Sequence, residues 1–411
     1  MITVRIGSEE HDLERVLESP ADYARALELA RGLGGYAECG CNMASPRPKL
    51  VIRAHGMIFI LARWPDDPRP HLGGCPFLDR YNRLKGTTTK RDPFQFTGGI
   101  HDMRLDVALK VAAGGQKTPT RRPSTAAART QRRAAPLLAF LQYAWQSAGL
   151  HTWPGYGRRG WNACWVRLVG EMAECNINGR PGSEVLHVME RWDEARKADL
   201  AAELEAFHNG ASISKDSYQR RLIIGEIDVL RPSPHGGQLK LRQARHWYFL
   251  SNELYEQFQQ KYKIALTGIG REDLRCVVVL AFEKSRQGYL NVMDAAAMLA
   301  NGQFIPCDSS YEAAMSDRLV AENRAFEKPL RHIDNAPVHP DFRLTDTVPE
   351  TVIEVLGLAG NPEYDQRMAE KRAYYRENGL PLVEWVPTTE SLAAVQLPAP
   401  VPGRPTRAAG A

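Results

Sequence analysis

The sequence predicts an α+β protein of several domains, and three observations support this. Its 411 residues are enough for two or three domains. Two pairs of cysteine and histidine residues flank a predicted β-hairpin within the first hundred residues. A Gly/Pro-rich stretch with six cations and no acid interrupts the chain after residue 112, and predicted helices and strands alternate beyond it.

The composition is that of an ordinary globular protein, with 43% hydrophobic and 25% charged residues. Neither a run of 18 apolar residues nor an N-terminal basic region followed by an apolar core is present, so we expect no membrane span and no signal peptide. The seven cysteines are an odd number and form no small disulfide framework, which favours reduced thiols and a cytoplasmic location. A net charge of +5 slightly favours a polyanionic partner.

A zinc site is predicted around the N-terminal hairpin. Residues 49–54 and 57–63 form two apolar runs joined by His55 and a glycine, which is typical of a hairpin. The four side chains that flank it make a Cys3His set, which suits the tetrahedral coordination of Zn²⁺: Cys39, Cys41, His71 and Cys75. His55 is an alternative to His71 as the fourth ligand. The competing interpretation is three buried free cysteines and two surface histidines.

The chain divides into six predicted segments. They are an N-terminal zinc-ribbon-like domain (1–112), a flexible linker (113–136), a helical domain (137–210), a sheet region (211–307), a C-terminal α/β core (308–387) and a disordered tail (388–411). The linker is either a basic arm that contacts phosphates or a solvated tether. The helical middle, with its basic aromatic loop 153–161, is either winged-helix-like or an ordinary helical subdomain.

The C-terminal core carries the clearest candidate for chemistry. A helix is predicted over 309–329 with Glu312 in its first turn, and Asp341 opens a short strand. Glu354 lies within the apolar strand 351–357, where a buried carboxylate is costly without a partner such as a divalent cation. Asn361 and a proline begin the next helix, which carries Arg367 and Lys371 on one stripe.

These motifs resemble those of the PD-(D/E)xK, or restriction-endonuclease-like, superfamily. Pro340-Asp341 matches its P-D element, Glu354 its second acid and Glu312 the acid of the preceding helix. The lysine expected two residues after Glu354 is Leu356, but some members carry this base on the following helix, where Lys371 stands with Arg367 one turn earlier. The resemblance covers about 80 residues.

The resemblance implies hydrolysis of phosphodiester bonds. Asp341 and Glu354 would hold Mg²⁺, Lys371 would act on the attacking water or the phosphate, and Glu312 would support the metal or the lysine. A nuclease-like fold that only binds nucleic acid is the alternative.

The whole chain also resembles a family of uncharacterised bacterial proteins similar in layout to the cargo of plasmids and integrative elements. Its marks are three N-terminal cysteines and a C-terminal P-D-F…I-E-V…K-x-x-Y-Y pattern. This resemblance implies a nucleic-acid partner, DNA more than RNA. The sequence therefore predicts a metal-dependent nuclease that serves a mobile element. The alternatives are a non-catalytic nucleic-acid-binding accessory protein with a structural zinc site, and a protein-interaction scaffold.

Overall fold

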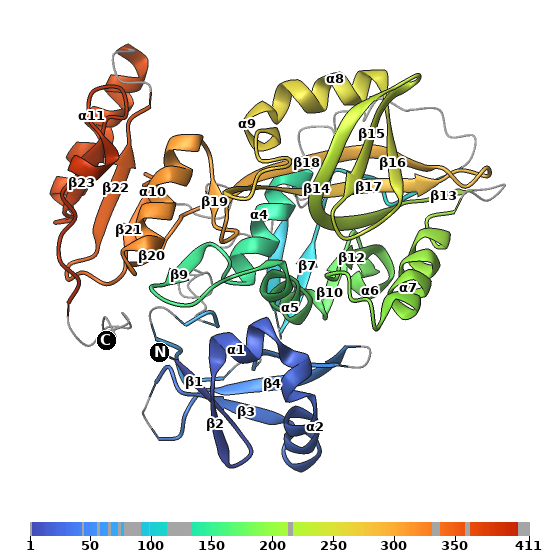
Figure 1. Ribbon diagram of the computed structural model, residues 1–411, viewed down its shortest axis with the longest axis horizontal. Helices are drawn as coiled ribbons and strands as arrows, with labels where there is room; N and C mark the ends of the chain where they lie inside the picture. Colours follow the sequence, from blue (N-terminus) through green and yellow to red (C-terminus); the bar gives the residue numbers. More distant parts are fainter. Residues whose placement is uncertain are drawn as a thin grey trace, which may run out of the picture. The chain divides into compact units, whose positions relative to one another are not determined.

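The computed structural model describes residues 2–42, 45–55, 58–64, 67–72, 75–77, 92–97, 99–112, 133–212, 217–330, 338–357 and 362–401. It has helices and several sheets, which confirms the predicted α+β class (Figure 1). The chain forms two compact units. Unit 1 comprises Met1–Asp79, Trp145–Arg167 and Ala300–Ala411, and unit 2 comprises Arg80–Ala144 and Leu168–Leu299. Within the described ranges, no helix is both long and apolar enough to cross a membrane.

The N-terminal part of unit 1 is a five-stranded antiparallel sheet in the order β2-β1-β3-β4-β5. Its elements are β1 (Thr3–Ile6), β2 (Glu9–Asp12), α1 (Leu13–Glu18), η1 (Pro20–Tyr23), α2 (Ala24–Leu33), β3 (Tyr36–Cys39), β4 (Lys49–His55) and β5 (Ile58–Arg63). The predicted hairpin is therefore β4–β5 at the edge of a larger sheet, and not a free-standing ribbon. The Asp12 carboxylate caps α1 by accepting from the backbone of Glu14.

A second five-stranded sheet of unit 1 runs in the order β23-β22-β21-β20-β9. Its elements are β9 (Thr152–Pro154), α10 (Ser310–Ala321), β20 (Ala325–Glu327), β21 (Phe342–Leu344), β22 (Thr351–Val355), α11 (Pro362–Glu377) and β23 (Leu382–Trp385). Strands β22 and β23 are parallel and the other pairs are antiparallel. Met315 and Leu319 of α10 belong to the same buried cluster as Phe342, Ile353 and Trp385, so α10 covers one face of this sheet.

Two predictions for this region are wrong. The helix predicted over 309–329 ends at Ala321, and β20 follows it. The predicted disordered tail begins too early, because η4 (Leu392–Ala394) follows β23 and Val395 is buried in the core of the sheet. Residues 402–411 of that tail and the helix cap Asn361 lie outside the described residues.

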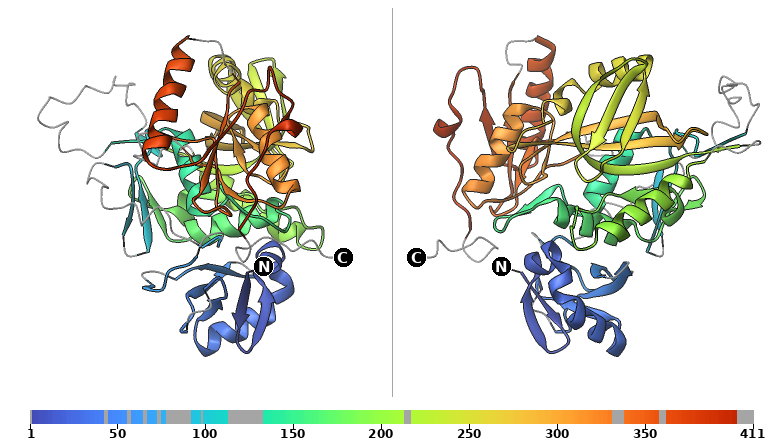
Figure 2. Two further views of the ribbon diagram at one scale, coloured as in Figure 1. Left: turned by 90° about the vertical axis from the view of Figure 1, so that its left-hand side faces the viewer. Right: turned by 45° about the vertical axis from the view of Figure 1, so that its right-hand side comes forward.

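Unit 2 contains a closed ring of strands, β14-β15-β16-β18-β17, with β12 attached to β14 (Figures 1 and 2). The long strand β14 closes it, because Arg221 to Glu226 pair with β17 and Ile227 to Ser233 pair with β15. The bounds are β12 (Leu186–Val188), β14 (Arg221–Ser233), β15 (Gly236–Leu241), β16 (Trp247–Ser251), α8 (Asn252–Lys261), α9 (Lys263–Leu266), β17 (Leu274–Lys284) and β18 (Leu290–Asn301).

The middle of the chain is not the separate helical domain that the sequence predicts. Its short strands pair with strands from distant parts of the sequence, β9 with β20, β10 with β7 and β12 with β14. The remaining elements are β6 (Phe94–Thr97), β7 (Ile100–Met103), β8 (Lys110–Ala112), α4 (Leu137–Ser147), α5 (Trp161–Met172), β10 (Cys175–Ile177), β11 (Arg180–Pro181), α6 (Gly182–Val185), α7 (Lys197–Asn209), β13 (Ser217–Gln219) and β19 (Pro306–Cys307). Most of the predicted basic linker, residues 113–132, lies outside the described residues.

Candidate active site and metal centre

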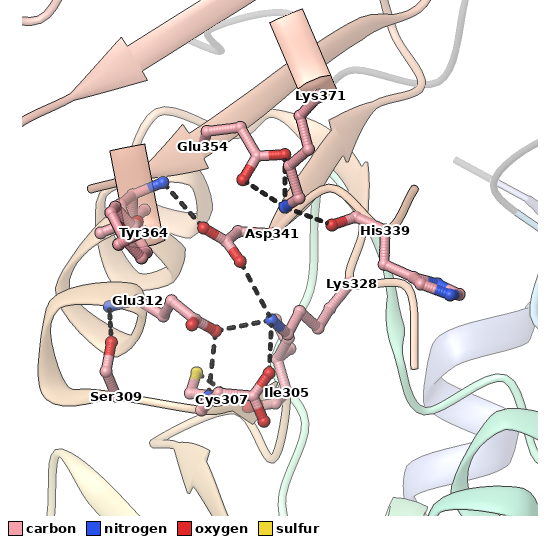
Figure 3. A network of polar contacts seen from close by, with 12 residues as sticks. Ile305, Cys307, Ser309, Glu312, Lys328, His339, Asp341, Glu354, Tyr364 and Lys371 are labelled. Carbon is pink, nitrogen blue, oxygen red and sulfur yellow. Dashed lines mark hydrogen bonds and ion pairs between the residues drawn. The ribbon is translucent and has the colours of Figure 1, made fainter. Parts of the chain in front are cut away.

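Asp341, Glu354 and Lys371 come together beside the second sheet of unit 1 (Figure 3). Asp341 lies immediately before β21, Glu354 lies within β22 and Lys371 lies in α11. Side chains alternate along a strand, so Glu354 points away from the face that Ile353 and Val355 pack against α10. This alternation directs the carboxylate of Glu354 toward α11.

Glu354 is buried and fully engaged by groups from α11. The Lys371 ammonium donates to both of its carboxylate oxygens, at 2.9 and 2.8 Å, and to the carbonyl oxygen of His339 at 2.7 Å. The hydroxyl of Tyr375, one turn further along α11, donates to Oε1 of Glu354 at 2.5 Å. Burial and the nearby charge of Asp341 raise the pKa of Glu354 above its ordinary value despite these donors.

A second lysine, Lys328, lies in the same acidic cluster. It directly follows β20, is 2% exposed, and its ammonium lies 2.6 Å from Glu312, 3.1 Å from Asp308 and 4.0 Å from Asp341 (Figure 3). Burial alone would lower the pKa of Lys328, but Glu312, Asp308 and Asp341 raise it on balance. Burial, reinforced by the charges of Asp341 and Asp308, raises the pKa of Glu312 to about 7.

Asp341 connects the two lysine–carboxylate groups. Its Oδ2 accepts a hydrogen bond from the backbone N–H of Val355 at 2.8 Å, and its Oδ1 faces Lys328. The result is a cluster of hard oxygen donors in which Glu354 and Glu312 each have a lysine of the chain as ion-pair partner, while the acids outnumber the lysines.

Arg367 does not join this cluster. Its guanidinium lies over the ring of Tyr364, 5.9 Å from the centroid, and its Nε donates to the carbonyl oxygen of Glu363. Arg367 is exposed, and in the described part of the chain it has no hydrogen bond or ion pair with Asp341, Glu354 or Glu312. Leu356, which occupies the expected lysine position, is buried.

Sequence reasoning missed Lys328 and Tyr375. Lys328 was hidden because the predicted helix ran through it, whereas α10 ends seven residues earlier at Ala321. Tyr375 lies four residues after Lys371, on the same face of α11, and this spacing was the available signal.

The four predicted zinc ligands meet at the end of β3, the central strand of the N-terminal sheet. The ligand atoms of Cys39, Cys41, His71 and Cys75 all lie within 4.8 Å of one another. The Cys39 and Cys75 sulfurs are 3.6 Å apart, and Nδ1 of His71 lies 3.3 Å from Cys41 and 3.4 Å from Cys75. Three thiols and one imidazole at this spacing form a Cys3His cluster that is compatible with zinc.

Local packing presents these ligands. Cys39 ends β3, and Gly40 is needed next because a Cβ at this position would lie 2.3 Å from the side chain of Thr3. Asp67 holds the loop that carries His71 by accepting from the backbone N–H of Lys49 and pairing with Arg69. The alternative ligand His55 ends β4, but its side chain lies outside the described residues.

Unit 2 contains a further cluster of potential ligands, Glu205, His208 and His246. Burial lowers the pKa of His208 to about 3, so its imidazole is neutral near pH 7. Lys284 already pairs with Glu205 at 2.6 Å and thereby neutralises the only acid of this set. We assign no ion to these residues.

A model of the family described as "Protein of unknown function (DUF1173)" matches residues 13–388, which include both the Cys3His cluster and the lysine–carboxylate cluster. The chain therefore belongs to this family. A comparison with curated proteins gives no match.

Proposed function

We propose that this protein is a Mg²⁺-dependent nuclease of the PD-(D/E)xK type that hydrolyses phosphodiester bonds in nucleic acid. One observation carries the proposal: Asp341, Glu354 and Lys371, which are separated by up to 30 residues, converge in one buried cluster. The arrangement of β20 to β23, with α10 on one face and α11 beside Glu354 on the other, supports a restriction-endonuclease-like core.

The donor set fits a hard divalent cation. Asp341 and Glu354 are 8% and 1% exposed and supply carboxylate oxygens, which Mg²⁺ prefers. Mutual repulsion of the carboxylates contributes to the raised pKa values of Glu354 and Glu312, and a cation would relieve it. When bound, the metal would lower the pKa of a coordinated water and offset charge on the transition state.

The residues of the chain supply the remaining functions. Lys371 orients the attacking water or binds a phosphate oxygen, and the carbonyl of His339 together with Glu354 holds its ammonium in position. Tyr375 fixes the rotamer of Glu354. Lys328 keeps Glu312 and Asp341 in place through charge-assisted contacts.

A specific observation favours the alternative of a non-catalytic nucleic-acid-binding protein. Both carboxylate groups already have ammonium partners, Lys371 for Glu354 and Lys328 for Glu312, so a metal ion must compete with two internal cations. The presence of Leu356 at the position of the expected lysine also favours a protein that binds without cleaving. We place this alternative second because Asp341, Glu354 and Lys371, the three residues that the proposed chemistry needs, lie in one cluster although they are distant in sequence.

The test is cleavage of labelled single-stranded and duplex DNA and of RNA with Mg²⁺ or Mn²⁺. The wild-type protein should cleave at least one of these substrates, and chelation should abolish cleavage. Asp341→Asn and Glu354→Gln preserve shape and remove the ligand charge, so each should lower the rate at least about 100-fold. Lys371→Met should lower it by about 10²–10⁴-fold.

Two exposed positions on α11 provide matched controls. Glu370→Gln removes a carboxylate next to Lys371, and Arg376→Met removes a cation from the last turn; both should leave the rate unchanged. A wild-type protein that binds these nucleic acids and cleaves none of them would reject the nuclease and favour the accessory protein. Cleavage that persists in Asp341→Asn would reject this site.

We further propose that the Cys3His cluster binds a structural Zn²⁺, and that the partner is DNA of a mobile element. The first proposal rests on the spacing of Cys39, Cys41, His71 and Cys75. The second rests on the net charge of +5 and on the resemblance of the sequence to mobile-element cargo. The winged-helix interpretation of the middle segment stays a prediction.

A further inference from the structure

The ring of strands in unit 2 has a specific topology. Numbered along the chain from β14 to β18, the five strands follow the order 1-2-3-5-4 and close back on the first through β14 and β17. The third and fifth strands, β16 and β18, are parallel, and α8 and α9 lie between the third and fourth strands. This is the topology of the OB-fold, a small Greek-key barrel whose second and third strands bind oligonucleotides or oligosaccharides.

Fold alone does not define function, so the side chains on β15 and β16 decide. Alternate residues Leu239, Tyr248 and Leu250 are buried inside the barrel. The residues between them face outward, and two of these, Trp247 and Phe249 on β16, are aromatic rings left partly exposed. A single exposed aromatic ring needs no explanation, but neighbouring rings on one outer face are typical of an interaction site.

The aromatic rings continue onto the loop between the fourth and fifth strands. Tyr289 in this loop is 56% exposed, and its ring lies edge-on to that of Phe249 with centroids 5.5 Å apart. Trp247 and Phe249 are two residues apart on one strand, which spaces their side chains by roughly 7 Å. The three rings therefore provide successive flat surfaces of the kind on which unpaired bases stack.

Cations border these rings. The Arg231 guanidinium of β14 lies over the ring of Trp247, 4.5 Å from the centroid. Lys240 of β15 pairs in register with Trp247, and Arg286 is exposed in the loop that carries Tyr289. Lys240 also has an acidic partner: Asp228 lies 3.5 Å away, and both side chains are about one-third exposed, so this ion pair is weak. The positive charges favour a polyanion over a neutral oligosaccharide.

We propose that the outer face of β15 and β16, with Trp247, Phe249, Tyr289, Arg231 and Lys240, binds single-stranded nucleic acid. Bases stack on the three rings, and the two cations contact phosphates. Duplex nucleic acid keeps its bases stacked inside the helix and so cannot use these rings. This site goes beyond the proposed nuclease centre, since binding here requires neither the metal nor cleavage.

The experiment is fluorescence anisotropy of labelled oligo-dT, oligo-rU and a DNA duplex with the full-length protein, without added divalent metal. The wild-type protein should bind the single strands at least tenfold more tightly than the duplex, and affinity should fall as salt rises. The oligo-dT and oligo-rU arms decide between DNA and RNA. Trp247→Leu and Phe249→Leu keep an apolar side chain and remove the aromatic ring, so each should weaken binding at least about fivefold.

Matched controls separate the site from general effects. Phe59→Leu removes a partly exposed strand aromatic that also has an arginine over it, Arg31 at 5.9 Å, and should leave affinity unchanged. Arg231→Gln and Lys240→Gln should each reduce the salt dependence by about 0.7 in the slope of log K against log salt, whereas Lys197→Gln on α7 should not. Circular dichroism shows whether each leucine variant is folded. If one is not, Arg231→Gln and Lys240→Gln still test the outer face of β15 and β16.

The proposal is overturned if both leucine variants fold and bind as tightly as wild type, if the duplex binds as well as the single strands, or if affinity does not depend on salt. Its failure and that of the nuclease are distinguishable. A protein that cleaves nothing yet binds single strands through Trp247 and Phe249 keeps this site and loses the other. If the protein cleaves in a metal-dependent way and the leucine variants bind as tightly as wild type, the nuclease proposal is kept and the single-strand site is rejected.

Discussion

At the scale of single residues, the candidate active site contains two ammonium groups and four carboxylates, the fourth being Asp308 beside Lys328. Lys371 neutralises Glu354 and Lys328 neutralises Glu312, while Asp341 lies between the pairs. Uncompensated carboxylates at this depth would be strongly destabilising. In the free protein the lysines therefore perform the electrostatic role that a bound metal ion would share. Substitution of Lys328 should mainly affect stability, whereas substitution of Lys371 should affect the cleavage rate.

Removing Lys328 should cost stability. Lys328→Met leaves Glu312 and Asp341 buried beside each other without a cation, and we expect the free energy of unfolding to fall by about 3–5 kcal/mol. The double variant Lys328→Met with Glu312→Gln removes one of the two charges and should recover part of this loss. Urea denaturation measures both.

The control for this measurement is Lys197→Met, which removes an exposed lysine paired with Glu194 on the surface. It should change the free energy of unfolding by less than about 1 kcal/mol. A loss of stability in Lys328→Met no larger than that of the control would show that the buried charges are compensated by other groups.

Glu312 should make stability depend on pH. Its pKa in the folded protein is about 7, above the ordinary value of 4.5, so the folded state holds this proton more tightly than the unfolded chain. The contribution of Glu312 is therefore complete below pH 4.5 and is lost as pH rises through 7. Relative to Glu312→Gln, metal-free wild type should lose up to roughly 3 kcal/mol over this range and nothing further above it. Urea titrations at several pH values test this, and a difference that stays constant or grows with pH contradicts it.

At the scale of elements, the sequence correctly predicted those helix ends and turns that depend on residues only a few positions apart. The Pro362 start of α11, its end before Gly379 in a left-handed conformation, and the hairpin β4–β5 all follow from residue preferences within a few positions. The predicted end of α10 was wrong because the stop signal is Asn323, which adopts a left-handed conformation (φ 55°) just after the C-cap Glu322 and is a weaker signal than glycine. The pairing of β20 with β9 and β21 then determines where the strand begins.

The candidate site was predictable only where its residues belong to local sequence patterns. Asp341, Glu354 and Lys371 could be placed because each occupies a recognisable position in a strand or helix. Lys328 could not, since its role depends on the fold of β20 against β21 rather than on any motif around it. Arg367 shares the helix of Lys371 but lies over Tyr364 instead, because one turn of helix is enough to leave the cluster.

At the scale of the whole molecule, the domain boundaries drawn along the sequence do not match the two compact units. Unit 1 combines three separate stretches of chain, and pairs such as β9 with β20 join residues more than 170 positions apart. Composition shifts mark where a chain can be flexible but say nothing about which distant strands pair. The closed ring of unit 2 was missed for the same reason, since it depends on β14 pairing with both β15 and β17.

The Cys3His cluster should stabilise the N-terminal part of unit 1 through a metal that joins ligands 36 residues apart. Purified protein should contain about one zinc per chain, and Cys39→Ala should contain none. Cys276→Ala, which removes another fully buried cysteine far from the cluster in sequence, is the control and should retain the zinc. Chelation should lower the melting temperature of wild type and of the control by more than about 5 °C, and leave Cys39→Ala unchanged, because a structural zinc contributes directly to folding. Metal analysis and thermal melts provide the two readouts. Wild-type protein without zinc, or with the same melting temperature before and after chelation, would reduce the cluster to three free thiols beside a histidine.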